Sequence, residues 1–275
     1  MQTTQINGAT IEYEVQGTGE PVLLIHGSII ADAYAPLLAE PAIANRLQLI
    51  AYHRRGFAGS SRAVAPFSIA QQAADARVLL RTLGIERAHV AGHSYGGVIA
   101  LQLALDAPEV VHSLALLEPA VMAVPSGQQF AENMAPAGEL YASGKVAEAV
   151  DAFLQGAAGA GYRAVTERVL PGAMVQAVAD AATFFQIELP ALAEWSFTQE
   201  QAARIAAPAL SVLGGESPGL WPGWTEIDNL LKTWLPQTEG FVLPNATHLL
   251  QIQNPRGMAE GLAGFFARHP IPVTA

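Results

Sequence analysis

The chain has 275 residues, of which 51% are hydrophobic and 14% charged, and this composition excludes an intrinsically disordered protein. Its formal net charge of -10 argues against nucleic acid or an anionic membrane surface as the main partner. Cysteine is absent, so disulfides, thiolate catalysis and Cys-based metal sites are excluded.

The first residues predict a hairpin at the edge of a sheet. The pair Asn7-Gly8 is favoured in tight hairpin turns, and apolar residues alternate with glutamates over residues 11–15. No basic run followed by an apolar core precedes this hairpin. We therefore expect no signal peptide, and, with cysteine absent, a cytoplasmic location. No apolar run reaches about 18 residues, so we expect no membrane span.

Further along, short runs that are apolar on every side alternate with helical patterns. Such runs are typical of parallel strands covered on both faces. Alternating strands and helices predict a mostly parallel sheet with helices on both faces. The predicted strands are 22–25, 47–52, 88–91, 113–117, 209–213 and 240–243. Helices are predicted at 68–83 and 96–105, between strands, and at 255–267, after the last strand.

One long segment, residues 120–205, interrupts this alternation. It is rich in Ala and Gly and contains no convincing strand, and helices are expected around 145–154, 162–170 and 174–187. A crossover connection does not need roughly 85 residues. We interpret the segment as a helical lid inserted into a core domain made of residues 1–119 and 206–275.

A G-x-S-x-G sequence, Gly92 to Gly96, lies between a predicted strand and a predicted helix. In this setting a nucleophilic serine is placed on a sharp, strained turn, and the two glycines leave room for the neighbouring backbone. Ser94 is therefore the candidate nucleophile.

With these motifs the chain resembles the α/β-hydrolase superfamily, over about residues 6–118 and from 209 to the end. The resemblance implies an α/β fold with a mostly parallel eight-stranded sheet. It also implies an oxyanion hole, because His26-Gly27 is followed by Ser28 at the position of one backbone N–H donor. The second donor would be the backbone N–H of Tyr95, and the hydroxyl of Ser28 is a candidate third donor.

Residues 52–60 resemble another loop of this family, with two departures. His53 stands where Asp is usual, and Ala58 stands where Gly is usual. We interpret this loop as architectural and His53 as a surface or loop histidine.

His248 is the only histidine that follows the last predicted strand and precedes the last helix, which makes it the candidate general base. The family's usual acid position, after the strand that follows the lid, holds Ser217. Glu118 stands directly after the predicted strand 113–117, where some members of the family carry the acid, and burial of a carboxylate there requires a partner. We therefore choose Glu118, with Glu216 as the main alternative and Asp228 as a weaker one.

The predicted function is hydrolysis of an ester or lactone of a small, fairly apolar substrate through an acyl-serine intermediate. Trp221 is a candidate pocket residue. No metal and no cofactor are expected, and the oligomeric state, monomer or dimer, is open. Serine at position 94 argues against epoxide hydrolase and haloalkane dehalogenase chemistry. Carbon–carbon bond hydrolysis, perhydrolase activity, acyl transfer and a ligand receptor on the same scaffold remain alternatives.

The aromatic side chains of the lid segment are candidates for pocket walls, but most of them are expected to form the core of the lid. They are Phe130, Tyr141, Phe153, Tyr162, Phe184, Phe185 and Trp195.

Overall fold

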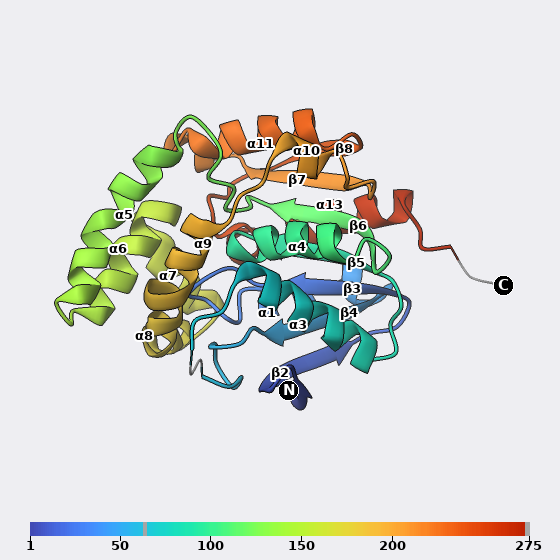
Figure 1. The fold of residues 1–275 in the computed structure, drawn as a ribbon, viewed down its shortest axis with the longest axis horizontal. Coiled ribbons are helices and arrows are strands. Elements are labelled where there is room, and N and C mark those ends of the chain that lie inside the picture. Colours follow the sequence, from blue (N-terminus) through green and yellow to red (C-terminus); the bar gives the residue numbers. More distant parts are fainter. Residues whose placement is uncertain (63–64, 273–275) are drawn as a thin grey trace.

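The computed structural model describes residues 1–62 and 65–272. Within these ranges eight strands form one sheet in the order β1-β2-β4-β3-β5-β6-β7-β8. The first two pairings, β1 with β2 and β2 with β4, are antiparallel, and all others are parallel. The predicted eight-stranded, mostly parallel sheet is confirmed (Figure 1). The strands are β1 (Gln2–Ile6), β2 (Ala9–Gln16), β3 (Glu20–Ile25), β4 (Leu47–His53), β5 (Ala88–His93), β6 (Val111–Leu117), β7 (Ala209–Gly214) and β8 (Thr238–Leu243).

The hairpin between β1 and β2 turns at Asn7 and Gly8, whose φ angles are 47° and 79°. Two consecutive positive φ angles are typical of the two-residue turn that matches the twist of the flanking strands. The Asn-Gly signal therefore predicts both the hairpin and its place in the chain.

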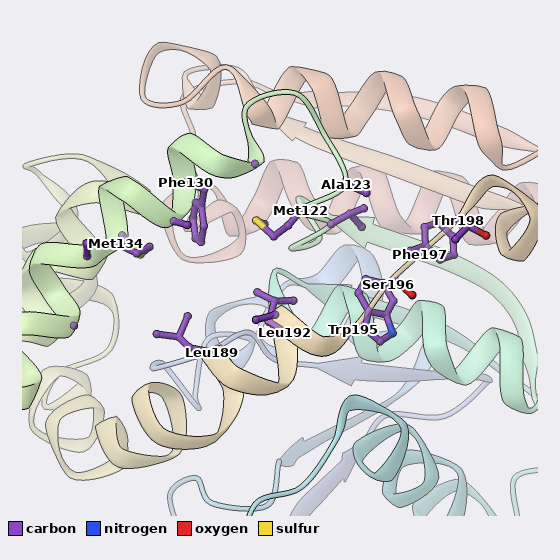
Figure 2. A pocket seen from close by; sticks show the side chains of 16 residues that line it. Met122, Ala123, Phe130, Met134, Leu189, Leu192, Trp195, Ser196, Phe197 and Thr198 are labelled. Atoms are coloured by element: carbon purple, nitrogen blue, oxygen red, sulfur yellow. The ribbon is translucent and has the colours of Figure 1, made fainter.

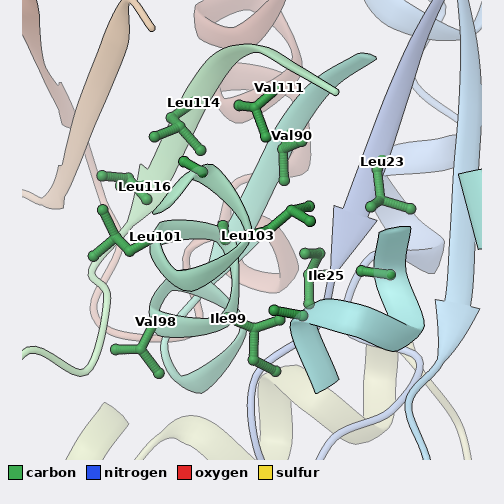
Figure 3. Close-up of a cluster of buried hydrophobic side chains, with 14 of the residues drawn as sticks. Leu23, Ile25, Val90, Val98, Ile99, Leu101, Leu103, Val111, Leu114 and Leu116 are labelled. Atoms are coloured by element: carbon green, nitrogen blue, oxygen red, sulfur yellow. The ribbon is translucent and has the colours of Figure 1, made fainter. Parts of the chain in front are cut away.

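Helices cover both faces of the sheet. One face carries α3 (Ile69–Thr82), α4 (Tyr95–Asp106) and α11 (Gly223–Trp234), and the other carries α1 (Ala35–Leu38), α2 (Pro41–Ala44) and α13 (Pro255–Arg268). The helix α4 is apolar on nearly all sides and is buried along most of its length. Figure 3 shows its side chains packed against residues of β3, β5 and β6. This packing fixes the start of α4, where Ser94 lies.

The segment between β6 and β7 is helical throughout its regular structure, as predicted. Figure 1 shows most of its helices gathered to one side of the sheet. We call residues 120–205 the helical insertion. It contains α5 (Gly127–Ala142), α6 (Val146–Ala158), α7 (Tyr162–Val169), α8 (Ala173–Thr183), the π-helical turn η1 (Phe184–Glu188), α9 (Leu189–Glu194) and α10 (Gln199–Ala202).

The sequence did not predict α5. This helix runs through Pro136, a residue that removes one backbone hydrogen bond from a helix interior. Packing of α5 along α6 offsets that loss. Packing against a neighbouring helix cannot be inferred from local helix propensity.

The helical insertion has a hydrophobic core of its own, and the loop after β3 takes part in it. Ile29, Ile30 and Ala33 of that loop are buried among side chains of α6 and α8. The loop that follows β3 is therefore packed against the insertion as well as against the sheet.

The helices of the described part of the chain are short or carry polar residues. None of its helices combines the length and the apolar character needed to cross a bilayer.

Candidate active site

Ser94 lies on a sharp turn between β5 and α4, with φ 53° and ψ -119°. This conformation is uncommon for a residue with a side chain and is typical of a strained nucleophile turn. A Cβ atom at Gly96 would collide with the carbonyl oxygen of Ile25, and one at Gly92 would collide with the backbone of Gly96. Both glycines of the motif are therefore required by the close approach of the backbone.

The end of β6 fixes this turn from the side. The amide of Ser94 donates to the carbonyl oxygen of Leu117 at 2.9 Å, and its own carbonyl oxygen accepts from the amide of Ala120 at 3.0 Å. Ser94 and the residue that follows β6, Glu118, are thus held at the same edge of the sheet.

Glu118 and His248 form a buried pair at this edge. The Nδ1 atom of His248 lies 2.8 Å from Oε2 of Glu118, and Oε1 accepts from the amide of Gly214 at 2.8 Å. The Glu118 residue is 2% exposed and has a φ of 42°. Because a carboxylate accepts, Nδ1–H of His248 donates to it, and the Nε2 lone pair is left to take a proton.

One ring contact and one hydrogen bond to its backbone hold His248 in place. The indole of Trp224 stacks on its imidazole with centroids 4.2 Å apart, and Nε2 of His93 donates to the carbonyl oxygen of His248 at 2.7 Å. Burial and the adjacent His248 lower the pKa of His93 well below its ordinary value. His93 therefore stays neutral, with its proton on the nitrogen that faces the carbonyl.

The alternative acids are placed elsewhere. Glu216 is exposed to solvent, and Asp228 accepts from the Ser211 hydroxyl at 2.7 Å and pairs with Lys232 at 2.6 Å. Ser217 is buried, and its hydroxyl has no partner among the described residues. Of these four positions, only Glu118 is joined to His248.

The loop after β3 brings Gly27 next to Ser94, the candidate nucleophile. A Cβ atom at Gly27 would lie 3.1 Å from Cβ of Ser94. Within the described part of the chain, the backbone N–H groups of Ser28 and Tyr95 donate to no protein acceptor. The first amide of a helix such as α4 lacks an intrahelical partner.

The hydroxyl of Ser28 does not serve as the predicted third donor. It donates to Oε2 of Glu188, the last residue of η1 in the insertion, at a distance of 2.5 Å. That expectation is wrong, because a carboxylate from a segment 160 residues further along the chain takes this hydroxyl.

A buried arginine that sequence reasoning did not single out lies behind this loop. Arg54 is 1% exposed and forms an ion pair with Glu188, which is fully buried. Its guanidinium also donates to the carbonyl oxygens of His26 at 3.0 Å and Gly27 at 2.9 Å, and to Gln72 at 2.5 Å. Arg54 lies in the segment 52–60 that resembles a loop of the family, but no pattern in the neighbouring residues identifies Glu188 as its partner.

His53 is not the surface or loop histidine that the sequence suggested. It is the last residue of β4, is 6% exposed, and lies 2.6 Å from Glu12 and 2.9 Å from Asp32. Burial alone would lower the pKa of His53, but hydrogen bonds to Asp32 and Glu12 outweigh that effect and raise it. Its role is to join β2 and the loop after β3 to β4.

An apolar groove of about 730 Å³ lies between α5, α9 and the segments at 121–127 and 195–198. Its lining carries no charged side chain, and Figure 2 shows several of its larger side chains. None of the described residues that line it is Ser94, Glu118 or His248. The lining residues are Val121, Met122, Ala123, Gly127, Phe130, Ala131, Met134, Ala135, Gly138, Leu189, Leu192, Ala193, Trp195, Ser196, Phe197 and Thr198.

Aromatic rings connect this groove with His248. Phe130 packs on Trp221 at 5.2 Å, Trp221 packs on Trp224 at 5.0 Å, and Trp224 stacks on His248. Trp221 therefore lies between the groove and the histidine, and its indole N–H donates to the carbonyl of Ser126 at 3.2 Å.

The other aromatic residues of the insertion pack mainly on one another. Phe153 lies against Phe184 at 4.4 Å, and Tyr141 stacks on Phe185 at 4.5 Å. These four side chains and Tyr162 form part of the insertion's own core, as expected from the sequence, whereas Trp195 packs against the core of the sheet. In the described ranges, His, Asp and Glu form no group of three that could hold a metal ion.

Comparison with known proteins gives a family and several relatives. The profile described as "alpha/beta hydrolase fold" matches residues 20–255. A putative carbamate hydrolase, RutD, of Azorhizobium caulinodans is 42% identical over 110 residues, which cover 40% of this chain and 41% of that protein. A fluoroacetate dehalogenase of a Burkholderia species is 37% identical over 118 residues, which cover 41% of this chain and 38% of that protein. The matched stretch thus spans about two fifths of these relatives.

Solved structures resemble the chain over nearly its whole length. An N-acyl homoserine lactone degrading enzyme, Est816, superimposes with a TM-score of 0.74 at 24% identity, covering 96% of this chain and all of that one. An enol-lactonase of Burkholderia xenovorans superimposes with a TM-score of 0.78 at 20% identity, covering 97% of this chain and all of that one. At these identities the likeness concerns the fold.

Proposed function

Since the chain belongs to the alpha/beta hydrolase fold family, we propose that it is a serine hydrolase that cleaves an ester or lactone through an acyl-serine intermediate. The observation that carries this proposal is the buried Glu118–His248 pair at the edge of the sheet where Ser94 lies on its strained turn. A carboxylate that orients an imidazole within reach of a serine nucleophile is the arrangement that acyl transfer requires.

The proposed reaction begins when Nε2 of His248 takes the proton of the Ser94 hydroxyl as its oxygen attacks the substrate carbonyl. The carbonyl carbon becomes tetrahedral, and its bond to the ester oxygen then breaks. His248 gives the proton to that oxygen, which leaves as an alcohol or stays attached as the hydroxyl of an opened lactone. Water then gives a proton to His248 as its oxygen attacks the acyl-serine. The bond between the acyl carbon and Oγ of Ser94 breaks, the acid is released, and His248 returns the proton to Ser94. Glu118 keeps Nδ1–H in place and stabilises the imidazolium that forms at each step.

The negative charge on the carbonyl oxygen needs fixed donors. We assign this role to the backbone N–H groups of Ser28 and Tyr95, which have no protein acceptor in the described part of the chain. Ser28 follows Gly27, which lies against Ser94, and Tyr95 follows Ser94 directly. Loss of one such donor typically lowers kcat by about a hundredfold or more.

The substrate class follows from the surroundings of the site. The helical insertion acts as the lid, and the apolar groove with Trp221 favours a small, fairly apolar substrate without a charged acyl or leaving group. The carbamate and lactone substrates named for relatives and structural neighbours share a carbonyl carbon open to attack, which supports the same class. The serine at position 94 gives no support for dehalogenation, a reaction for which the family uses a carboxylate nucleophile.

Turnover kinetics with p-nitrophenyl acetate and with small aliphatic lactones test this proposal. The wild type is expected to release nitrophenol from p-nitrophenyl acetate through many turnovers, because His248 serves both acylation and deacylation. Where deacylation is the slower step, a burst of one nitrophenol per active site precedes the steady rate. Ser94→Ala should show neither phase. A single stoichiometric release followed by stable retention of the acyl group would instead indicate a ligand receptor on this scaffold.

A further inference from the structure

We propose that Glu188 of the helical insertion is a positioning residue for the oxyanion loop, so that docking of the lid and assembly of the oxyanion hole are one event. The oxyanion loop is defined here as residues 26–30, directly after β3. This inference rests on the proposed function, since it assigns Glu188 a part in the same reaction.

Glu188 is joined to the oxyanion loop by direct and indirect bonds. Its Oε2 accepts the hydroxyl of Ser28 at 2.5 Å, and its Oε1 pairs with Arg54. Arg54 in turn donates to the carbonyl oxygens of His26 at 3.0 Å and Gly27 at 2.9 Å. The carboxylate of one lid residue therefore fixes three consecutive residues of the loop.

The loop requires this support because its backbone is strained. Ile29 has a φ of 70°, and the amide of Ile30 donates to the carbonyl oxygen of Ser28 at 2.8 Å across it. A three-residue turn with positive φ is rare, and a β-branched residue is unfavourable there. Such a conformation persists only when the surrounding structure holds it, and Ile29 is buried in the core of the insertion.

The position of Glu188 in the chain also fits a dedicated role. It ends the π-helical turn η1, in which the amide of Leu189 bonds to the carbonyl of Phe184 five residues earlier. Such π-helical turns are rare in proteins, and those that occur are often found at functional sites. The wider turn shifts the side chains that follow it relative to a regular helix, and Glu188 is fully buried on the side that faces Arg54.

Asp180 offers a matched control. It is as buried as Glu188 and also joins the insertion to the loop after β4, since it pairs with Arg62 and accepts the amide of Ala58 at 2.9 Å. None of its partners among the described residues belongs to the oxyanion loop. Asp180→Asn therefore loosens the lid without touching residues 26–30.

The test compares Glu188→Gln, Ser28→Ala, their double variant and Asp180→Asn in steady-state hydrolysis of p-nitrophenyl acetate. Glu188→Gln should lower kcat at least about tenfold with KM changed less than about threefold, because the oxyanion donors act in the transition state. Ser28→Ala keeps both buried charges, and so folds, and should lower kcat several-fold. The double variant should lose less than the product of the two single losses, and Asp180→Asn should stay within about twofold of wild type.

Hydrogen exchange of the peptide that covers residues 28–30 is read in parallel. It should be faster in Glu188→Gln than in wild type or Asp180→Asn. Equal losses of kcat in Glu188→Gln and Asp180→Asn, full multiplicativity of the Ser28 and Glu188 effects, or unchanged exchange would overturn the proposal. If the wild type hydrolyses no ester while Glu188→Gln still speeds exchange, the positioning role stands and the proposed function fails.

Discussion

The carboxylate of Glu118 is buried at the end of β6 and has two partners, the His248 ring and the Gly214 amide. Each carboxylate oxygen of Glu118 accepts one of these two hydrogen bonds. A buried carboxylate without such partners would be costly, and its two hydrogen bonds with His248 and Gly214 account for its burial.

Replacement of Glu118 by Gln is expected to lower kcat for p-nitrophenyl acetate by about a thousandfold, because a neutral amide cannot stabilise the imidazolium form of His248. Glu216→Gln, at an exposed position after β7, serves as the control and should keep kcat within about twofold. Circular dichroism checks that both variants are folded. Loss of activity in Glu216→Gln with full activity in Glu118→Gln would reverse the assignment of the acid.

Some residues of the site could be predicted from the sequence because their signals are local. Ser94 is fixed by glycines within two positions, and His248 and Glu118 by their order after particular strands. The Glu188 partner of Arg54 lies 134 residues away, and those of His53 lie 41 and 21 residues away, so no neighbouring pattern reveals them. Such pairs depend on tertiary packing.

At the level of secondary structure, some helices of the helical insertion could be predicted from the sequence and others could not. The helices α6, α7 and α8 were predicted near their observed positions, because their apolar residues recur at helical spacing. The helix α5 was missed because Pro136 and its glycines favour an interruption. The groove lies between α5 and α9, so its location could not be predicted either.

If the groove holds the apolar part of the substrate, a charge inside it should discriminate between substrates by chain length. Leu192→Glu is expected to lower kcat/KM for p-nitrophenyl octanoate at least about tenfold and to leave that for p-nitrophenyl acetate within about threefold, because burial of a carboxylate beside an alkyl chain is unfavourable. Val175→Glu, at a position of α8 that is 77% exposed, is the control. Equal losses for both esters in Leu192→Glu would place the acyl chain elsewhere.

At the scale of the whole molecule, several buried histidines have no part in the proposed hydrolysis. His89 of β5 is fully buried, stacks on Phe266 of α13 at 4.4 Å and lies 2.7 Å from the Ser113 hydroxyl. Burial, with help from the neighbouring His112, lowers the pKa of His89 to about 4, although its bond to Glu20 acts in the opposite direction.

This lowered pKa predicts a loss of stability in acid. Between about pH 6.5 and pH 4 the unfolded chain binds a proton at His89 that the folded protein does not, so the free energy of unfolding falls as the pH falls. Chemical denaturation at pH 7 and pH 5 should show that wild type loses roughly 1–2 kcal/mol more than His89→Gln, whose side chain does not titrate. Identical losses in the two proteins would show that His89 is not responsible.

Labelling with a fluorophosphonate probe, followed by peptide mapping, tests most directly whether Ser94 is an activated nucleophile. We expect one phosphonyl group per chain, on the peptide that carries Ser94. The label should be lost in Ser94→Ala and should form more slowly in Glu118→Gln. A well-folded wild type that remains unlabelled, or that is labelled at another serine, would contradict this expectation.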